Sequence, residues 1–219
     1  MSKENWRYMN SVQILNDYSW CFCGHRDSLD QVYNLSLMVI DVPGDLVECG
    51  IASGSGIAAM KKACPEKTVW GYDSFEGIQL AGPNDTEQPG VGPITHDTSG
   101  NLLVSSGVTV CSRAWVESCL NGWGFKANED FQLVEGWVQN TIPIISPKKI
   151  ALLRLDMDLY DPTIFALRAF WKKMPKKSIL IIDDGNLKGV VRACDDFFNE
   201  IGYTPKWVKN SLNPFYLIK

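Results

Sequence analysis

Short apolar segments that each end at an acidic residue recur along the chain. They cover residues 45–50, 68–73, 131–136, 150–156 and 178–184, and helix-like stretches such as 57–63 separate them. Near-continuous apolar strands that alternate with helices are typical of a parallel sheet covered by helices on both faces. We therefore expect an α/β fold built around such a sheet.

The last two predicted strands, residues 205–209 and 215–218, are separated only by residues 210–214. A connection this short can join antiparallel strands but not parallel ones, so it predicts a hairpin at the edge of the sheet. The strands together predict a seven-stranded, mostly parallel sheet with an antiparallel terminal hairpin. This pattern resembles the Rossmann-like class I methyltransferase architecture more than a dinucleotide-binding fold, which would close with another crossover connection.

The chain has 219 residues, which is enough for one substantial core, and we expect a single domain over residues 1–219. We expect an amino-terminal helical segment within residues 1–42, with helical periodicity over 30–42 up to a Pro-Gly turn. Residues 77–107 are rich in Gly, Pro, Asn, Thr and Ser and show no sustained period. Since so long an irregular stretch is usually a functional lid or a disordered segment, and this one follows the second strand, we interpret it as a lid loop.

The formal net charge is −4, and the chain has no long run of Lys or Arg. This argues against nucleic acid or an anionic membrane surface as a partner and favours small-molecule chemistry. The first residues carry no apolar run behind a basic stretch, and no segment reaches the apolar length that spans a bilayer. We expect a cytoplasmic protein, with homo-oligomer formation left open.

Seven cysteines are scattered among the expected core elements, which fits buried thiols in a reducing compartment. A zinc site formed by Cys21, Cys23 and His25 is the alternative. It is disfavoured because this spacing lacks the two-residue gap of zinc knuckles and no second ligand pair follows at a suitable distance.

The first predicted strand ends at Glu48 and runs into a glycine-rich turn whose glycines are not in the order that binds a pyrophosphate. A carboxylate here would repel a diphosphate and attract the cationic amino group or sulfonium of S-adenosylmethionine. Asp73 ends the second strand, where it can accept hydrogen bonds from both ribose hydroxyls of an adenosine ligand; the alternative is a helix N-cap. Trp137 follows the third strand, where an adenine could stack.

Two further strands end in pairs of aspartates, Asp156 with Asp158 and Asp183 with Asp184. These carboxylates would converge, and like charges at close range are unfavourable unless one is protonated or a cation is bound. Hard oxygen ligands suit Mg²⁺, so we predict a magnesium site that includes Asp156 and Asp183. The alternatives are that Asp184 caps the next helix and that Asp158 is solvated.

Five motifs, in the same order along the chain, resemble the macrocin-type O-methyltransferases, a family that methylates sugar hydroxyls. They are PGDLVECG (43–50), VWGYDSFEG (69–77), EGWVQNTIP (135–143), LLRLDMDLY (152–160) and IIDD (181–184). The resemblance covers most of the chain between residues 43 and 196. One departure lies at residues 50–55, where the family usually has Gly-Val-Trp-Arg-Gly-Gly and this chain lacks the aromatic residue and the cation.

The resemblance implies a set of site residues. Those that it implies for S-adenosylmethionine are Glu48, Gly50, Ser53, Gly54, Asp73, Ser74, Glu135, Gly136 and Trp137. Those that it implies for Mg²⁺ are Asp156, Asp183 and Asp184, with Asp156 also acting as the catalytic base.

The expected function is therefore S-adenosylmethionine-dependent and Mg²⁺-dependent methylation of a hydroxyl group on a small molecule. A sugar or glycoside is the expected acceptor because two adjacent oxygens can chelate the metal, and a catechol-like diol would satisfy the same geometry. Two alternatives use the same fold. A nucleotide-dependent oxidoreductase is disfavoured by the glycine order and the terminal hairpin, and a non-catalytic small-molecule-binding domain is disfavoured by the aspartates.

Overall fold

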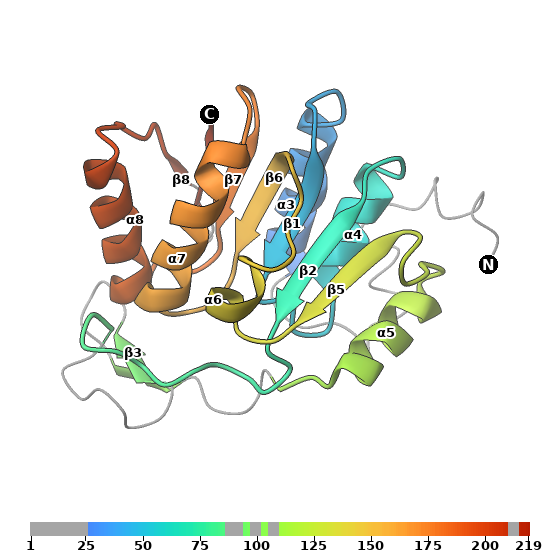
Figure 1. Ribbon diagram of the computed structural model, residues 1–219, viewed down its shortest axis with the longest axis horizontal. Coiled ribbons are helices and arrows are strands. Elements are labelled where there is room, and N and C mark those ends of the chain that lie inside the picture. The colour runs from blue at the N-terminus through green and yellow to red at the C-terminus, as the bar shows by residue number, and fades with distance from the viewer. Residues whose placement is uncertain (1–25, 86–93, 97–101, 105–109, 210–214) are drawn as a thin grey trace.

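The computed structural model describes residues 26–85, 94–96, 102–104, 110–209 and 215–219 (Figure 1). Its centre is a seven-stranded sheet in the order β5-β2-β1-β6-β7-β9-β8. The strands are β1 (Asp45–Cys49), β2 (Val69–Asp73), β5 (Phe131–Glu135), β6 (Ile150–Leu155), β7 (Ile179–Ile182), β8 (Val208–Lys209) and β9 (Phe215–Ile218). The first five are parallel to one another, and β9 lies antiparallel between β7 and β8. The predicted parallel sheet with an antiparallel terminal hairpin is confirmed.

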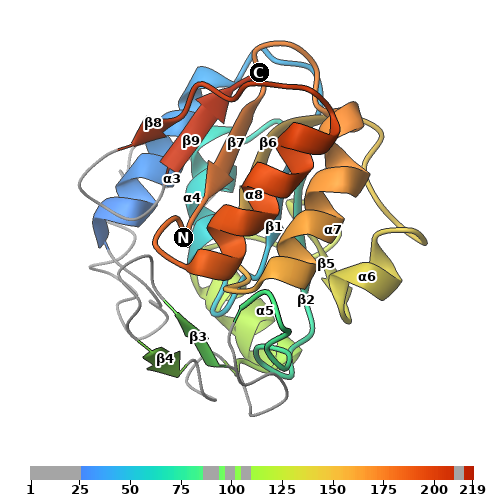
Figure 2. The same ribbon diagram turned by 90° about the vertical axis from the view of Figure 1, so that its left-hand side faces the viewer.

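Helices cover both faces of this sheet. They are α3 (Arg26–Met38), α4 (Ser55–Ala63), α5 (Arg113–Gly122), α6 (Val138–Thr141), α7 (Tyr160–Phe170) and α8 (Lys188–Glu200), with a 3₁₀ turn, η2 (Trp171–Lys173), after α7. One core cluster contains buried residues of α3, α4 and α5, and a second contains buried residues of α6, α7 and α8. Figure 2 shows α3 and α4 on one side of the sheet and α7 and α8 on the other.

The central strand β6 shows why these apolar segments form a doubly covered sheet. All six of its residues are buried. Leu152 packs into the cluster under α3 and α4, whereas Leu153 packs into the cluster under α7 and α8. Since successive side chains of a strand point to opposite faces, a strand covered on both sides needs apolar residues at every position. Arg154 is the one charged residue in this strand, and its burial requires partners.

The structure differs from the sequence expectations at several boundaries. Helix α3 ends at Met38, and the residues up to Val42 form turns in which Ile40 is exposed. The segment 77–107 contains a small antiparallel sheet, β3 (Ile94–His96) with β4 (Leu102–Val104), where no periodicity had indicated strands. Strands this short carry too few side chains to produce a visible alternation.

Several expectations fall wholly or partly outside the described residues. The candidate zinc ligands Cys21, Cys23 and His25 lie there, as do the amino-terminal residues before α3 and much of 77–107. Among the described cysteines, those at positions 49, 64, 119 and 194 are buried, as expected for core thiols. None of the helices in the described ranges combines the length and apolarity needed to cross a membrane.

Candidate active site at the carboxyl edge of the sheet

Backbone hydrogen bonds continue the parallel pairing just past the strand ends and bring the predicted site residues to one edge. The amide of Gly136 donates to Asp73 O at 2.8 Å, and that of Gly50 donates to Tyr72 O at 2.8 Å. The amide of Asp156 donates to Cys49 O, and that of Asp183 donates to Leu155 O, both at 2.9 Å. The acidic residues after β6 and β7 are thereby placed beside the glycine-rich turn after β1.

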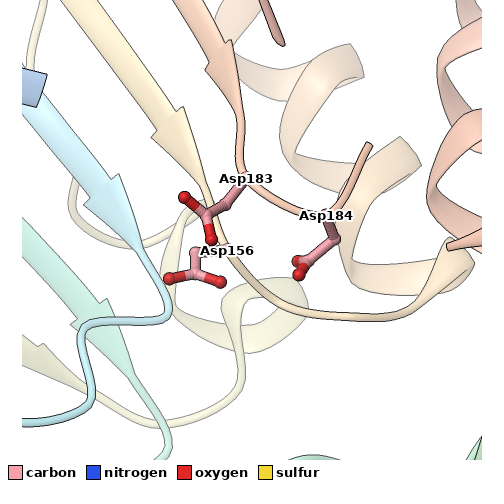
Figure 3. A group of neighbouring side chains, drawn as sticks. All are labelled: Asp156, Asp183 and Asp184. Atoms are coloured by element: carbon pink, nitrogen blue, oxygen red, sulfur yellow. The ribbon is translucent and has the colours of Figure 1, made fainter. Parts of the chain in front are cut away.

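Three aspartates form a compact cluster at this edge. Asp156 follows β6, and Asp183 and Asp184 follow β7 (Figure 3). Each offers a carboxylate oxygen, and these oxygens all lie within 4.8 Å of one another. The structure therefore brings together the three residues that the sequence named as metal ligands. Their oxygen donors and half-buried positions fit a hard divalent cation such as Mg²⁺.

Arg154 lies at the centre of this cluster, and the sequence reasoning assigned it no role. Its Nη1 contacts Glu48 Oε1 and lies 2.9 Å from Asp156 Oδ2, while Nη2 donates to Asp183 Oδ1 at 2.6 Å. The side chain comes from β6 and is almost fully buried, with 9% of the residue exposed. The signal that could have revealed it is a lone charge inside the apolar run 150–155.

Arg154 changes the electrostatic argument for a metal. The sequence argument was that converging carboxylates require a proton or a cation, and one cation is already part of the protein. Burial nevertheless raises the pKa of Asp156 and of Asp184 well above the usual range, and neighbouring aspartates raise both further. A bound divalent cation would favour the ionised forms, so a cation site remains compatible with the cluster.

Asp184 and Asp158 interact with each other rather than taking the alternative roles considered from the sequence. Asp184 Oδ2 accepts a hydrogen bond from the amide of Asp158 at 3.0 Å. Helix α8 begins only at Lys188, with Leu187 at its N-cap position, so Asp184 does not cap it. The pKa of Asp158 is raised to about 6, first by burial and then by the charge of Asp183.

At the other half of the edge, the Asp73 carboxylate organises the glycine-rich turn. Its Oδ2 accepts from the amide of Ile51 and its Oδ1 from the amide of Phe75, each at 2.8 Å. The neighbouring Ser74 hydroxyl accepts from Glu76 N and donates to Gly77 O, which closes a tight local turn. Asp73 therefore connects β2 to the turn after β1, and no helix follows for it to cap.

Glu48 lies beneath the turn rather than facing a ligand. The residue is 1% exposed, and its Oε1 contacts Arg154. Its carboxylate packs against Gly56, where an added Cβ would lie 2.0 Å from Oε1. Burial raises the pKa of Glu48 to about 7, although Arg154 opposes the shift. This burial argues against the expected direct contact between Glu48 and a cofactor, because 1% of the residue is exposed.

The glycine at position 50 is needed where the two halves of the edge meet. Gly50 has φ +79°, and a Cβ there would lie 1.7 Å from the carbonyl oxygen of Asp156. Gly54 also has a positive φ, at the start of α4, while Ser53 is buried and its hydroxyl has no hydrogen-bond partner among the described residues. The turn is therefore compact, and it lies directly against the loop that carries Asp156.

The residues expected near an adenine continue the edge beyond β2. Glu135 pairs with Asp73 in the β2–β5 register, is exposed, and lies 3.5 Å from the guanidinium of Arg113. Gly136 has φ +126°, and Trp137 is half-buried at the start of α6. The structure thus places Glu135 and Gly136 beside Asp73, with Trp137 next along the chain.

Asp85 fixes the first part of the segment 77–107 to the start of α7, the helix that follows the loop carrying Asp156. The Asp85 carboxylate is buried and accepts from Tyr160 N at 2.7 Å and from Gly82 N at 3.0 Å. Tyr160 begins α7, and the N-cap residue Leu159 has no side chain that can cap it. Asp85 supplies that cap from a distant segment. Gly189 of α8 leaves the space, since a Cβ there would lie 1.9 Å from Asp85 Oδ1.

Known proteins resemble this chain in sequence and in fold. It is 29% identical over 168 residues to 8-demethyl-8-(2,3-dimethoxy-alpha-L-rhamnosyl)-tetracenomycin-C 4'-O-methyltransferase of Streptomyces olivaceus, covering 74% of this chain and 60% of that protein. It is 30% identical over 149 residues to demethyldecarbamoylnovobiocin O-methyltransferase of Streptomyces niveus, covering 66% and 53%. The chain therefore spans little more than half the length of these two relatives.

Solved structures share the architecture. The O-methyltransferase NovP superposes with a TM-score of 0.73 at 24% identity, covering 88% of this chain and 79% of that one. CalS11, a calicheamicin methyltransferase, gives 0.70 at 22% identity, with coverage of 96% and 86%. The Rossmann-like class I methyltransferase fold expected from the strand pattern is confirmed. Because the model of the macrocin-O-methyltransferase (TylF) family matches residues 20–208, the chain belongs to that family.

Proposed function

We propose that the protein is an S-adenosylmethionine-dependent and Mg²⁺-dependent O-methyltransferase that acts on a hydroxyl group of a sugar or glycoside. The observation that carries this proposal is the cluster of Asp156, Asp183 and Asp184 beside the glycine-rich turn after β1. Family membership supports the transfer of a methyl group, and the name of a relative that acts on a rhamnosyl compound supports a glycoside acceptor.

In this proposal the cofactor binds along the ends of β1, β2 and β5. Among the described residues, each carboxylate oxygen of Asp73 accepts one hydrogen bond, so each retains a lone pair for a ribose hydroxyl. The residues proposed to line the remainder of this site are Gly50, Ser53, Gly54, Ser74, Glu135, Gly136 and Trp137. Glu48 takes part indirectly, because its buried carboxylate supports the residues after β1 without lining the cofactor site.

The chemistry is assigned to the other half of the edge. Mg²⁺, when bound by Asp156, Asp183 and Asp184, would lower the pKa of the acceptor hydroxyl and stabilise negative charge on its oxygen. Asp156 is proposed as the base that accepts the hydroxyl proton, since its carboxylate belongs to the cluster that would hold the cation and the hydroxyl group. The close approach of Gly50 to the Asp156 carbonyl fixes the methyl-donor turn against this residue, which favours a defined distance between the two reactants.

A diol is the acceptor that fits three aspartates best. Three carboxylates leave other positions of an octahedral Mg²⁺ open, and two adjacent hydroxyl groups of a sugar can fill two of them. A catechol satisfies the same geometry. The segment 77–107 is proposed to close over this acceptor, because Asp85 attaches its first part to the start of α7, the helix that directly follows the loop carrying Asp156.

The test is methyl transfer from S-adenosylmethionine to a panel of sugars, glycosides and catechols, with and without EDTA. We expect EDTA to abolish turnover, added Mg²⁺ to restore it, and binding of S-adenosylhomocysteine in calorimetry to survive chelation. NAD should bind far more weakly than S-adenosylhomocysteine. Full activity in EDTA would remove the metal-assisted mechanism, and equal binding of NAD would remove the cofactor assignment.

A further inference from the structure

Each aspartate of the cluster has one carboxylate oxygen bound by a donor of the protein. Asp156 Oδ2 pairs with Arg154, Asp183 Oδ1 accepts from Arg154 and from the Ser28 hydroxyl at 3.1 Å, and Asp184 Oδ2 accepts from the amide of Asp158. A side-chain hydrogen bond also joins Asp158 to Asp184. Hydrogen bonds therefore orient Asp183 and Asp184, and an ion pair with Arg154 holds Asp156.

Arg154 provides this fixation for two of the three aspartates at once. A guanidinium group is a planar fork, so Nη2, which donates to Asp183, and Nη1, which forms an ion pair with Asp156, hold both carboxylates around one rigid group. Partners that fix the orientation of metal-binding side chains affect metal affinity nearly as much as the ligands do. We propose that Arg154 is the positioning residue of the cation site, an inference that rests on the proposed metal-dependent function.

Glu48 helps to hold the Arg154 guanidinium in place. Its Oε1 contacts the same Nη1 that pairs with Asp156, and its carboxylate is buried against Gly56 in the first turn of α4. The guanidinium therefore connects Glu48, which lies beneath the proposed cofactor site, to two aspartates of the proposed cation site. This accounts for an acidic residue at the end of β1 that is too deeply buried to meet a ligand.

Charge neutralisation alone would not explain this arrangement. A cation next to a divalent metal repels it, so a residue that merely offset negative charge would weaken the site once the metal was bound. Orientation and charge can be separated with Arg154→Lys. The lysine keeps the positive charge, but it is a point donor rather than a fork and cannot direct both Asp156 and Asp183.

The experiment measures Mn²⁺ affinity of the S-adenosylhomocysteine complex by electron paramagnetic resonance of the free ion. We expect Arg154→Lys to weaken Mn²⁺ binding by about 10- to 100-fold, while the affinity for S-adenosylhomocysteine changes much less. Arg168→Lys is the matched control, because Arg168 pairs with Glu200 on the surface and should bind Mn²⁺ like the parent. Ser28→Ala, which removes only the second donor to Asp183, should give a smaller loss than Arg154→Lys.

The outcomes separate this inference from the function on which it rests. Parent-like Mn²⁺ affinity in Arg154→Lys overturns the positioning role and leaves the metal-dependent function standing. A parent protein that binds S-adenosylhomocysteine but no Mn²⁺ overturns both. If Arg154→Lys does not fold, the comparison is made in a Glu48→Gln background, where one fewer buried carboxylate needs a cation; equal Mn²⁺ affinity with Arg and with Lys at position 154 there would overturn the proposal as well.

Discussion

The two halves of the carboxyl edge differ in what binds their carboxylates. At the end of β2, the Asp73 carboxylate accepts hydrogen bonds from two backbone amides, which folding of the chain itself provides. At the ends of β6 and β7, the aspartates depend on one buried guanidinium and on each other, and burial raises the pKa of Asp156 and Asp184. Backbone amides satisfy the carboxylate of the first half, whereas the proposed cation would offset the negative charge of the second.

The two halves differ because backbone dipoles stabilise one carboxylate, whereas a charged side chain must stabilise several. Backbone amides are dipoles that need no counterion, so they can stabilise a single carboxylate without creating a new charge to bury. Several carboxylates in one place exceed what a single arginine neutralises. In such a site, the glycine-rich turn and Asp73 would bind the cofactor, and the aspartate cluster with its cation would activate the acceptor hydroxyl.

The largest expected effect is that of Asp156→Asn. The change removes a proposed ligand and the proposed base together, so turnover should fall by about 10²- to 10⁴-fold. Binding of S-adenosylhomocysteine, measured by calorimetry, should stay close to that of the parent because Asp73 and the turn are untouched. A variant that turns over like the parent would contradict the division between the two halves.

Asp158→Asn is the matched control for this variant. Asp158 has φ +62°, a conformation that asparagine tolerates, and its amide would still donate to Asp184. Its side chain is not among the three clustered ligands. The loss of turnover should therefore be much smaller than for Asp156→Asn, and an equal loss would place Asp158 in the catalytic machinery.

The second prediction concerns the cofactor half. Asp73→Ala should weaken S-adenosylhomocysteine binding by about 2–4 kcal/mol, because two charge-assisted hydrogen bonds to ribose are removed. The amides of Ile51 and Phe75 also lose their acceptor, which should loosen the turn. Asp45→Ala is the control, since Asp45 accepts from Trp70 at the opposite end of β1 and should leave binding unchanged in calorimetry. Loss of Mn²⁺ binding in Asp73→Ala, with S-adenosylhomocysteine binding intact, would reverse the assignment of the halves.

The smallest effect is expected at Asp85, which attaches the segment after β2 to the start of α7. Asp85→Ala removes the acceptor for the first amide of α7 and should lower the free energy of unfolding by about 1 kcal/mol, the usual size of a lost helix cap. Urea unfolding and faster hydrogen exchange of the Tyr160 amide would measure it. Asp85→Asn retains an acceptor oxygen and should lose less. Unchanged exchange in Asp85→Ala would mean that the segment after β2 is not anchored at α7.

The sequence by itself determined the sheet and the three aspartates at its edge. A strand buried on both faces must be apolar at successive positions, and the carboxyl ends of parallel strands lie at the ligand-binding edge of an α/β sheet. The sheet and the position of the three aspartates therefore both follow from local patterns. The parallel pairing of the first five strands and the antiparallel pairing of β9 agree with what those patterns predicted, whereas the order of the strands came from the structure.

Only the tertiary structure decided how the charges are distributed. Glu48 and Arg154 are 106 residues apart, Arg154 and Asp183 are 29 apart, and Asp85 and Tyr160 are 75 apart. Periodicity reports on neighbours in the chain, whereas the pKa of a carboxylate and the capping of α7 depend on groups that meet only after the sheet has formed. The sequence therefore located Glu48 at the end of β1, but folding buried it under Gly56 and paired it with Arg154.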